Sequence, residues 1–320
     1  MELWNSIEAV PQDFAETVVT IGKFDGVHLG HQRLVGEAIN LAEEHGLAAV
    51  VLTFDRHPNA VLNQGQLQLP ITGPEQKHGL LAELGVDAVL TLPFDEALAA
   101  LPAEEFIETY LVDALRAKAV VVGQGFRFGA GGGGDVALLR LIGLERGFVV
   151  REVAHAEFAG EKISSTRVRA ALDTGDVRLA AELLNRTHAV RGIIEHGKKL
   201  GRTIGFPTAN MSRAAEGYLP LDAVYAGWLI VNHDDGSQTG YPAALSVGIN
   251  ETFEAVPRVL EAYVLDRDDL DLYDLDVTME FVEFVRPTLK FDSVETLIDA
   301  IKDDVARVRS ILEGRRFASR

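Results

Sequence analysis

The chain has 320 residues, 47% of them hydrophobic and 24% charged, which suits about two folded domains and argues against wholesale disorder. A formal net charge of −18 excludes a general attraction to nucleic acid or anionic membranes, and the lack of cysteine excludes disulfides and thiolate chemistry. The sequence shows neither a signal-peptide pattern nor an apolar run of about 20 residues. We therefore expect a cytoplasmic protein with no nucleic-acid or membrane partner, and its oligomeric state stays open.

The first half of the chain alternates strand-like and helix-like segments. In chain order the pattern predicts strand 17–21, helix 31–45, strand 48–54, helix 74–84, strand 88–92, helix 103–115, strand 119–122, helix 135–146 and strand 148–153. Continuous apolar strands separated by helices are typical of a parallel sheet that is covered on both faces. Ligands of such sheets bind at the carboxyl ends of the strands, near a reversal of strand order.

The pattern changes near Asn185. Two short helices, 164–172 and 176–184, precede it, and strand signals follow at 189–194, 226–231, 243–247, 258–265 and 277–284. Strands that are separated by turns rather than helices predict a small antiparallel barrel or sandwich. One helix closes the chain, with Asp292 as its expected N-cap and Glu295 completing a capping box. We place the domains at 1–185 and 186–320.

The first candidate site is His28-Leu29-Gly30-His31, which follows a strand and a glycine-containing loop and opens a helix. A helix N-terminus offers free amide donors to a phosphate, and Gly26 and Gly30 allow the backbone to approach it closely. Two imidazoles three residues apart lie on the same side of a helical turn and could stabilise charge on a reacting phosphorus. The alternative is an ordinary helix entry with incidental histidines.

The second candidate is Ile163-Ser164-Ser165-Thr166-Arg167-Val168-Arg169. Hydroxyl residues at a helix start are usually no more than N-caps. Here Arg169 follows Thr166 on the same helical face, so the hydroxyl groups and the cation would form a second phosphate-binding site. Both interpretations stay open on this stretch alone.

The third candidate runs from Gly201 to Asn210 and includes Pro207-Thr208-Ala209-Asn210. A loop bracketed by Gly201 and Gly205 enters a strand on which Thr208 and Asn210 point to the same side. A hydroxyl and an amide oxygen in that arrangement could bind Mg²⁺, which prefers oxygen ligands. The alternative is a tight loop with a Pro–Thr turn and no ligand.

Together these motifs resemble the prokaryotic bifunctional riboflavin kinase/FMN adenylyltransferase family, also called FAD synthetase. The first two match the HxGH and ISSTxxR motifs of the nucleotidyltransferase superfamily, and the third matches the PTAN motif of the flavokinase module. The resemblance covers nearly the whole chain, with both modules in the family's order. It implies a nucleotidyltransferase-type Rossmann-like domain at 1–185, followed by a flavokinase-type barrel at 186–320 that a C-terminal helix closes.

The resemblance also implies two reactions. The C-terminal domain would transfer the γ-phosphate of ATP to riboflavin and give FMN, with Glu261 as general base and with Thr208 and Asn210 holding Mg²⁺. The N-terminal domain would transfer AMP from a second ATP to FMN and give FAD and pyrophosphate. His28, His31 and Arg169 would stabilise the developing charge of that second step.

Further residues are assigned to the binding of ATP or flavin because they lie in these motifs or in matching segments beside them. They are Gly22, Phe24, Asp25, Gly26, Gly30, Phe54, Phe126, Phe128, Ser164, Ser165, Thr166, Gly201, Arg202, Gly205, Pro207 and Asn250. The rings of Phe54, Phe126 and Phe128 would lie either against the flavin or in the core.

One position departs from the family pattern. Gly125 stands where the family usually has Asp or Asn, a side chain that helps to hold the substrate of adenylylation. This leaves a second hypothesis, a riboflavin kinase with a degenerate adenylyltransferase domain, although Lys23 adds a compensating cation. A third hypothesis is a flavin-binding protein without turnover, against which Glu261 argues because binding alone needs no general base.

Overall fold

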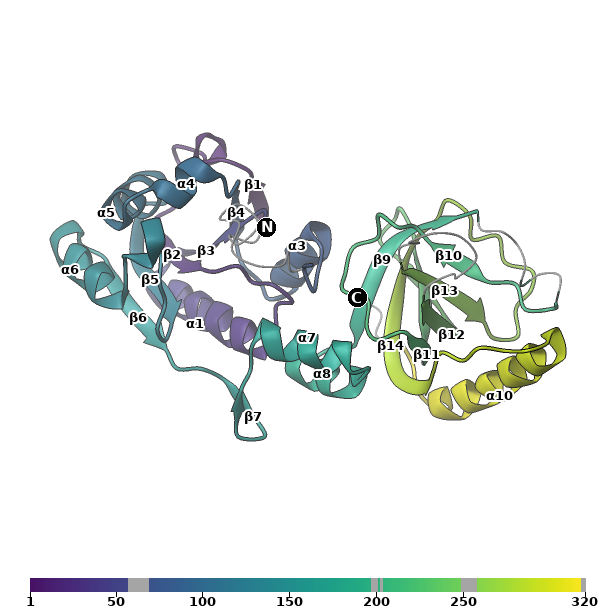
Figure 1. Ribbon diagram of the computed structural model, residues 1–320. Helices are drawn as coiled ribbons and strands as arrows, with labels where there is room; N and C mark the ends of the chain where they lie inside the picture. Colours follow the sequence, from purple (N-terminus) through teal and green to yellow (C-terminus); the bar gives the residue numbers. More distant parts are fainter. Residues whose placement is uncertain (57–68, 197–200, 202–203, 249–257, 318–320) are drawn as a thin grey trace. The chain divides into compact units, whose positions relative to one another are not determined.

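The computed structural model describes residues 1–56, 69–196, 201, 204–248 and 258–317. Contacts within the chain divide it into two compact units, Met1–Ser164 and Ser165–Arg320 (Figure 1). The two short helices between residues 165 and 184 therefore belong to the second unit. The domain boundary at 185/186 stays a prediction from the sequence.

The first unit is built on a six-stranded parallel sheet in the order β1-β4-β3-β2-β5-β6. Its strands are β1 (Glu2–Trp4), β2 (Thr17–Ile21), β3 (Ala48–Phe54), β4 (Ala88–Leu92), β5 (Ala117–Gly123) and β6 (Val149–Val153). All the predicted strands are present, and β1 adds an edge strand that was not predicted. The chain moves from β2 outward to β4 and then returns to β5 on the other side of β2. The order therefore reverses between β2 and β5, where ligands of such sheets bind.

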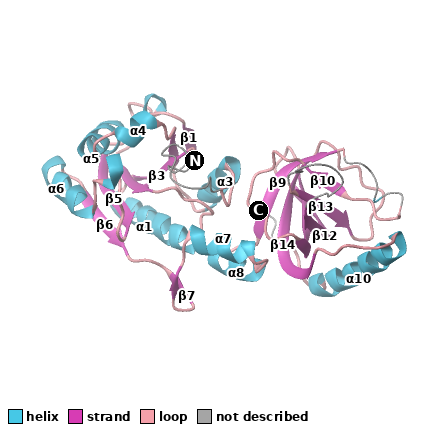
Figure 2. Ribbon diagram, in the orientation of Figure 1, coloured by secondary structure: helices cyan, strands magenta, loops and turns pink. Residues whose placement is uncertain are grey.

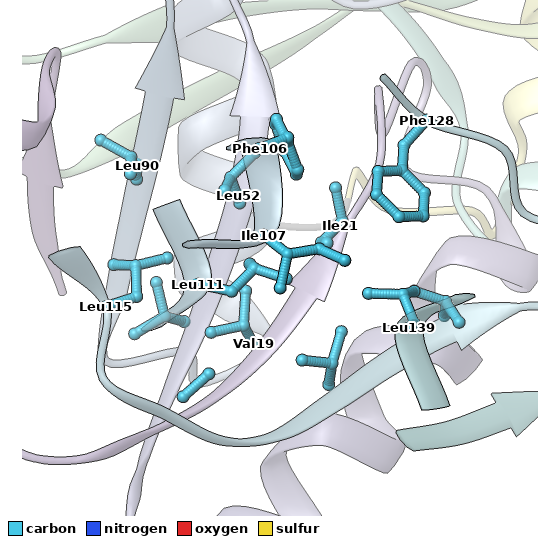
Figure 3. Packing of buried hydrophobic residues seen from close by; sticks show 14 of the residues in the cluster. Val19, Ile21, Leu52, Leu90, Phe106, Ile107, Leu111, Leu115, Phe128 and Leu139 are labelled. Carbon is cyan, nitrogen blue, oxygen red and sulfur yellow. The ribbon is translucent and has the colours of Figure 1, made fainter. Parts of the chain in front are cut away.

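Helices cover both faces of this sheet, as the sequence predicts. One apolar cluster joins the sheet to α1 (Leu29–His45) and α3 (Pro74–Glu83). The other joins it to α5 (Ala103–Phe106), to the π-helix η2 (Ile107–Ala114) and to α6 (Val136–Arg146). Figure 3 shows this second cluster, in which strand residues meet helix residues: Val19, Ile21, Leu52, Leu90, Phe106, Ile107, Leu111 and Leu139. The predicted helix 103–115 thus has the right extent but continues in π form after Phe106.

Shorter elements complete the first unit. They are η1 (Ile7–Ala9), α4 (Glu96–Ala100), η3 (Ala130–Gly132) and a small hairpin of β7 (Glu157–Phe158) and β8 (Glu161–Lys162). Figure 2 labels α4 and β7. None of these was predicted, because each is too short to show a hydrophobic period.

The second unit is a closed antiparallel barrel in the order β10-β13-β12-β11-β14-β9, which confirms the predicted barrel over a sandwich. Its strands are β9 (His188–Glu195), β10 (Ala209–Met211), β11 (Ala223–Asn232), β12 (Gln238–Gly248), β13 (Val259–Val264) and β14 (Asp276–Pro287). Helices α7 (Ser165–Asp173) and α8 (Val177–Leu184) precede the barrel, and α10 (Val294–Leu312) follows it. Val308 and Leu312 of α10 pack on Trp228 of β11, and Asp304 forms an ion pair with Arg286 of β14 at 2.7 Å.

The cap of α10 differs from the prediction. Ser293, not Asp292, is the N-cap, and its hydroxyl accepts a hydrogen bond from the Thr296 amide at 3.2 Å. Because the helix begins one residue later than expected, Thr296 takes the third helical position that the predicted box gave to Glu295. Serine caps a helix as well as aspartate does, so composition could not decide between the two neighbours.

His188 makes the barrel sensitive to acid. Its ring is 1% exposed, stacks on Phe281, and its Nε2 donates to the Tyr218 carbonyl oxygen at 2.6 Å. Burial lowers the pKa of His188 from its ordinary value of 6.5 to about 4. As the pH falls, His188 is therefore protonated in the unfolded chain before it is protonated in the folded one. The free energy of unfolding decreases between about pH 6.5 and pH 4, by at most about 3 kcal/mol.

We expect His188→Gln to flatten this pH dependence, because glutamine can donate to the same carbonyl group without titrating. Urea unfolding followed by Trp228 fluorescence in a Trp4→Phe background, at pH 7 and pH 5, measures the effect. Trp4 and Trp228 are the chain's two tryptophans, so the remaining signal comes from the barrel alone. An equal loss of stability at pH 5 with and without His188 would contradict the assignment.

Candidate functional sites

The loop after β2 turns sharply back into α1 at the reversal of strand order. Phe24, Gly26 and Val27 all have left-handed backbone, with φ of 50°, 81° and 39°. Phe24 and Val27 are buried, so core packing holds a conformation that costs energy in side-chain-bearing residues. A Cβ on Gly26 would lie 3.1 Å from Ile71, which together with its φ explains the glycine. Any part of Phe24 in ligand binding belongs to its backbone, because its side chain lies in the core.

The two histidines of the first motif lie together at the start of α1. His28 is the N-cap, and its Nδ1 accepts a hydrogen bond from the His31 amide at 3.3 Å. The two rings stack, with centroids 3.7 Å apart and planes 12° from parallel. Since Nδ1 of His28 is an acceptor, the proton of the neutral ring resides on Nε2, which becomes a donor. A Cβ on Gly30 would lie 3.1 Å from the His28 ring, so Gly30 makes room for that imidazole.

Residues just before α3 hold the same loop in place. Asp25 Oδ1 accepts from the Ile71 amide at 2.8 Å, and the Gly26 amide donates to Thr72 Oγ1 at 3.3 Å. Asp25 therefore has a structural task in the loop. Gly22, the first residue of the loop, donates its amide to the Leu52 carbonyl oxygen at 3.1 Å and so continues the sheet into the motif.

Aromatic residues gather at the carboxyl ends of β3 and β5. Phe128 is buried and packs on Phe106 and Phe126, with ring centroids 5.7 and 5.6 Å away, so it is a core residue. Phe126 and Phe54 are partly buried at the edge of the same cluster. Phe54 meets Phe94 edge to face at 5.5 Å. Of the three predicted rings, Phe54 and Phe126 keep surface that a ligand could cover.

The second motif lies where the two units meet in the sequence. Ser164 ends the first unit, and Ser165, Thr166 and Arg169 lie on α7 of the second. Arg169 is 8% exposed, so its stem is buried with the helix. The convergence of this motif with His28 and His31 in one site stays a prediction.

The barrel brings together three predicted residues that are far apart in the sequence. Thr208 Oγ1 donates to Glu261 Oε2 at 3.2 Å. Asn210 on β10 is the direct cross-strand partner of Glu261 on β13, and its Nδ2 donates to the Thr208 carbonyl oxygen at 3.4 Å. Burial raises the pKa of Glu261, and the hydrogen bond from Thr208 opposes that shift. A half-buried carboxylate of raised pKa beside a hydroxyl and an amide is suited to accept a proton.

The turn before this cluster depends on its glycines. The Gly201 carbonyl oxygen accepts from the amides of Ile204 and Phe206, at 3.2 and 2.8 Å. A Cβ on Gly201 would lie 2.2 Å from the Phe206 carbonyl oxygen, and Gly205 has φ of 85°. The turn delivers Pro207 and Thr208 to the start of β10. Arg202 and Asn250, which the sequence assigned to binding, lie outside the described residues.

Residues 10–167 match the FAD synthetase family, and residues 184–312 match the riboflavin kinase family. The chain is 37% identical to the bifunctional riboflavin kinase/FMN adenylyltransferase of Listeria monocytogenes, over 92% of this chain and 91% of that one. It belongs to the bifunctional riboflavin kinase/FMN adenylyltransferase family. The relative of that name in Escherichia coli K12 is 35% identical, over 95% of this chain and 93% of its own length. Since the chain matches both modules of the family, the kinase-only hypothesis is not favoured.

A solved structure from Streptococcus pneumoniae, described as a macrolide-efflux protein, resembles this bifunctional family member in fold. The two are 33% identical, with a TM-score of 0.85 over 96% of this chain and 98% of the other. Within the ranges that the structure describes, no helix combines the length and the apolar character that crossing a membrane requires.

The barrel cluster fits the Mg²⁺ that both reactions of the family call for. Thr208 offers a hydroxyl oxygen and Asn210 an amide oxygen, and both lie beside the carboxylate of Glu261. Hard oxygen ligands of this kind suit Mg²⁺, which usually binds few protein groups and completes its shell with phosphates and water. Among the described residues, no three His, Asp or Glu side chains form a group that could hold a metal.

A cleft beside Thr208 was not predicted. Arg267, Leu270, Leu272 and Tyr273 line it together with Pro207 and Thr208, and His196 stacks on Tyr273 with ring centroids 3.9 Å apart. Arg267, Leu270, Leu272 and Tyr273 belong to the aspartate-rich stretch 266–276, to which no function was assigned from the sequence. Apolar Leu270, Leu272 and Tyr273 within that acidic stretch were the available signal.

Proposed function

We propose that this chain makes FAD from riboflavin in two ATP-dependent steps, the first in the barrel unit and the second in the parallel-sheet unit. The observation that carries the proposal is that one chain holds two separate clusters of candidate site residues, Thr208–Asn210–Glu261 and His28–His31, each within a segment that matches the corresponding family. We expect the protein to act in the cytoplasm, where ATP is made.

In the first step, the ribityl hydroxyl of riboflavin attacks the γ-phosphorus of ATP. The new bond joins that oxygen to phosphorus, the bond to the β-phosphate oxygen breaks, and ADP leaves. Glu261 accepts the hydroxyl proton, and Thr208 holds this carboxylate in position through its hydrogen bond. Thr208 and Asn210 would hold Mg²⁺, which offsets phosphate charge when bound. The cleft lined by Arg267 and Tyr273 adjoins Thr208 and would receive the nucleotide.

In the second step, a phosphate oxygen of FMN attacks the α-phosphorus of ATP, and pyrophosphate leaves. No protein nucleophile is needed, so catalysis consists of positioning and charge stabilisation. His28 Nε2, His31 and the first amides of α1 would donate to the phosphate oxygens. Ser165, Thr166 and Arg169 would bind phosphate from α7.

A time course with riboflavin, ATP and Mg²⁺, followed by chromatographic separation of the flavins, tests the proposal. FMN should appear first and then convert to FAD. Accumulation of FMN without FAD would refute the second step. The absence of both products would leave the hypothesis of a flavin-binding protein without turnover.

Gly125 decides how well the second step runs. It has φ of 72°, and no atom lies within 4 Å of the position that a Cβ would occupy. Asparagine tolerates this backbone better than most residues and would restore the polar side chain that the family usually has there. We expect Gly125→Asn to raise kcat/KM for FAD formation about 3- to 10-fold, the effect of one added hydrogen bond.

The matched control for this change is Gly131→Asn. Gly131 has a similar φ of 60° and equally open surroundings in the same segment, so it carries the same backbone cost. Steady-state rates of FAD formation should rise only in the Gly125 variant. Equal rates in both variants would mean that position 125 does not contact substrate.

A further inference from the structure

A lysine is buried beside the loop of residues 22–28 between β2 and α1, which we call the phosphate loop. Lys77 on α3 is 8% exposed and lies on the core-facing side of the helix with Leu80 and Leu81. Its Nζ donates to the Phe54 carbonyl oxygen at 2.9 Å and to Thr53 Oγ1 at 3.4 Å. A buried ammonium group is costly unless it is hydrogen-bonded and paired with opposite charge, and neither proposed reaction step uses Lys77.

Thr53 continues this connection into the loop that leads to His28. It is the penultimate residue of β3, is fully buried, and its Oγ1 donates to the Lys23 carbonyl oxygen at 3.3 Å. The hydroxyl therefore accepts from Lys77 and donates to Lys23, and so links α3 to the loop through the end of β3. The next residue after Lys23 is Phe24, the first of the left-handed residues in the loop.

The segment just before α3 holds the loop at two further points. The Ile71 amide binds Asp25, and Thr72 Oγ1 accepts from the Gly26 amide. Burial lowers the pKa of Lys77, and the nearby carboxylates of Asp25 and Asp55 partly oppose this shift because they favour the charged ammonium form. Asp55 in turn accepts from the Phe94 amide at 2.8 Å. The ammonium group thus bonds directly to the end of β3, reaches the loop after β2 through Thr53, and interacts by charge with Asp25 and Asp55.

We propose that Lys77, through Thr53, is a positioning residue for adenylyl transfer that fixes the backbone of the phosphate loop for His28 and His31. The proposal rests on the proposed function of the first unit. Adenylyl transfer depends on geometry because no covalent step compensates for misplaced donors, and displacements of about 1 Å can cost two orders of magnitude in rate. Riboflavin phosphorylation in the barrel does not use this loop and should be unaffected.

The test compares Lys77→Met with Lys118→Met and Thr53→Val with Thr53→Ser. Lys118 is an exposed lysine of β5 that pairs with Glu16, so its variant controls for loss of one positive charge in the same unit. Thr53→Val removes the linking hydroxyl at nearly constant volume, and Thr53→Ser keeps it. Each full-length variant is assayed for FAD formation from FMN and for FMN formation from riboflavin, at two temperatures well below its unfolding midpoint.

We expect kcat for FAD formation to fall at least 10-fold in Lys77→Met and about 3- to 10-fold in Thr53→Val, with the KM for ATP changed less than kcat. Thr53→Ser and Lys118→Met should stay within about twofold of the wild type in both assays. The proposal is overturned if Thr53→Val keeps full activity, if Thr53→Ser loses as much as Thr53→Val, or if cooling restores the lost rate. If Lys77→Met does not fold, the Thr53 pair decides. The proposed function itself fails only if the wild type makes no FAD, which the same assay reports separately.

Discussion

Glu261→Gln is expected to slow riboflavin phosphorylation at least about 100-fold, because glutamine cannot accept the proton of the ribityl hydroxyl. Glutamine keeps the shape of the side chain and can still accept the hydrogen bond from Thr208. FAD formation from supplied FMN should remain within about twofold of the wild type, since that reaction is assigned to the other unit. Separate assays with riboflavin and with FMN as substrate measure the two effects.

The matched control is Glu195→Gln. Glu195 on β9 lies on the other side of Asn210 from Glu261, in the same register, and accepts a hydrogen bond from Ser212. If the Glu195 variant lost kinase activity and the Glu261 variant kept it, Glu195 on the neighbouring strand would be the general base instead of Glu261. Since burial raises the pKa of Glu261, the wild-type kinase rate should fall with acid at a pH above 4.5, the ordinary pKa of glutamate. In Glu261→Gln this acidic decline should disappear from the residual rate.

His28→Asn is expected to have the opposite effect. Asparagine is a good N-cap, so it can replace the Nδ1 acceptor that caps α1 while it removes the Nε2 donor. FAD formation should fall at least about 100-fold, the usual cost of losing one donor to a developing oxyanion. FMN formation should be unchanged, as measured with riboflavin and ATP under the same conditions.

Asp95→Asn provides the control for a changed cap in the same unit. Asp95 caps α4 by accepting from the Leu98 amide, and asparagine can do the same there. This variant should form both flavins at the wild-type rate. If His28→Asn abolished both activities, the two reactions would share one site and the division between the units would be wrong.

Hydrophobic patterns in the sequence predicted most of the fold. Strand β3 and the central residues 119–122 of β5 are nearly continuous apolar runs, so their type and position follow from composition. β1 and β10 have three residues each and are defined by their pairing partners, which no local pattern specifies. The change from α- to π-helix after Phe106 likewise leaves the apolar spacing of the segment intact.

The candidate sites were predictable to different degrees. His28 and His31 are three residues apart at a helix start, so helix geometry alone predicts that they lie on the same side, and the structure adds that their rings stack. Thr208 and Glu261 are 53 residues apart, and only the family resemblance brought them together before the barrel did. Lys77 was not singled out from the sequence, although it lies on the core-facing side of α3. A lysine at such a position usually extends its charged end to solvent, so nothing in the sequence indicated that this one is buried.

The central claim, that one chain holds two separate active sites, is tested most directly by mixing the two variants. Neither His28→Asn nor Glu261→Gln alone should convert riboflavin to FAD, since the first stops at FMN and the second does not reach it. An equimolar mixture with riboflavin, ATP and Mg²⁺ should form FAD, because FMN made by the first variant is adenylylated by the second. A mixture that accumulates FMN without FAD, while wild type forms both, would contradict two independent sites.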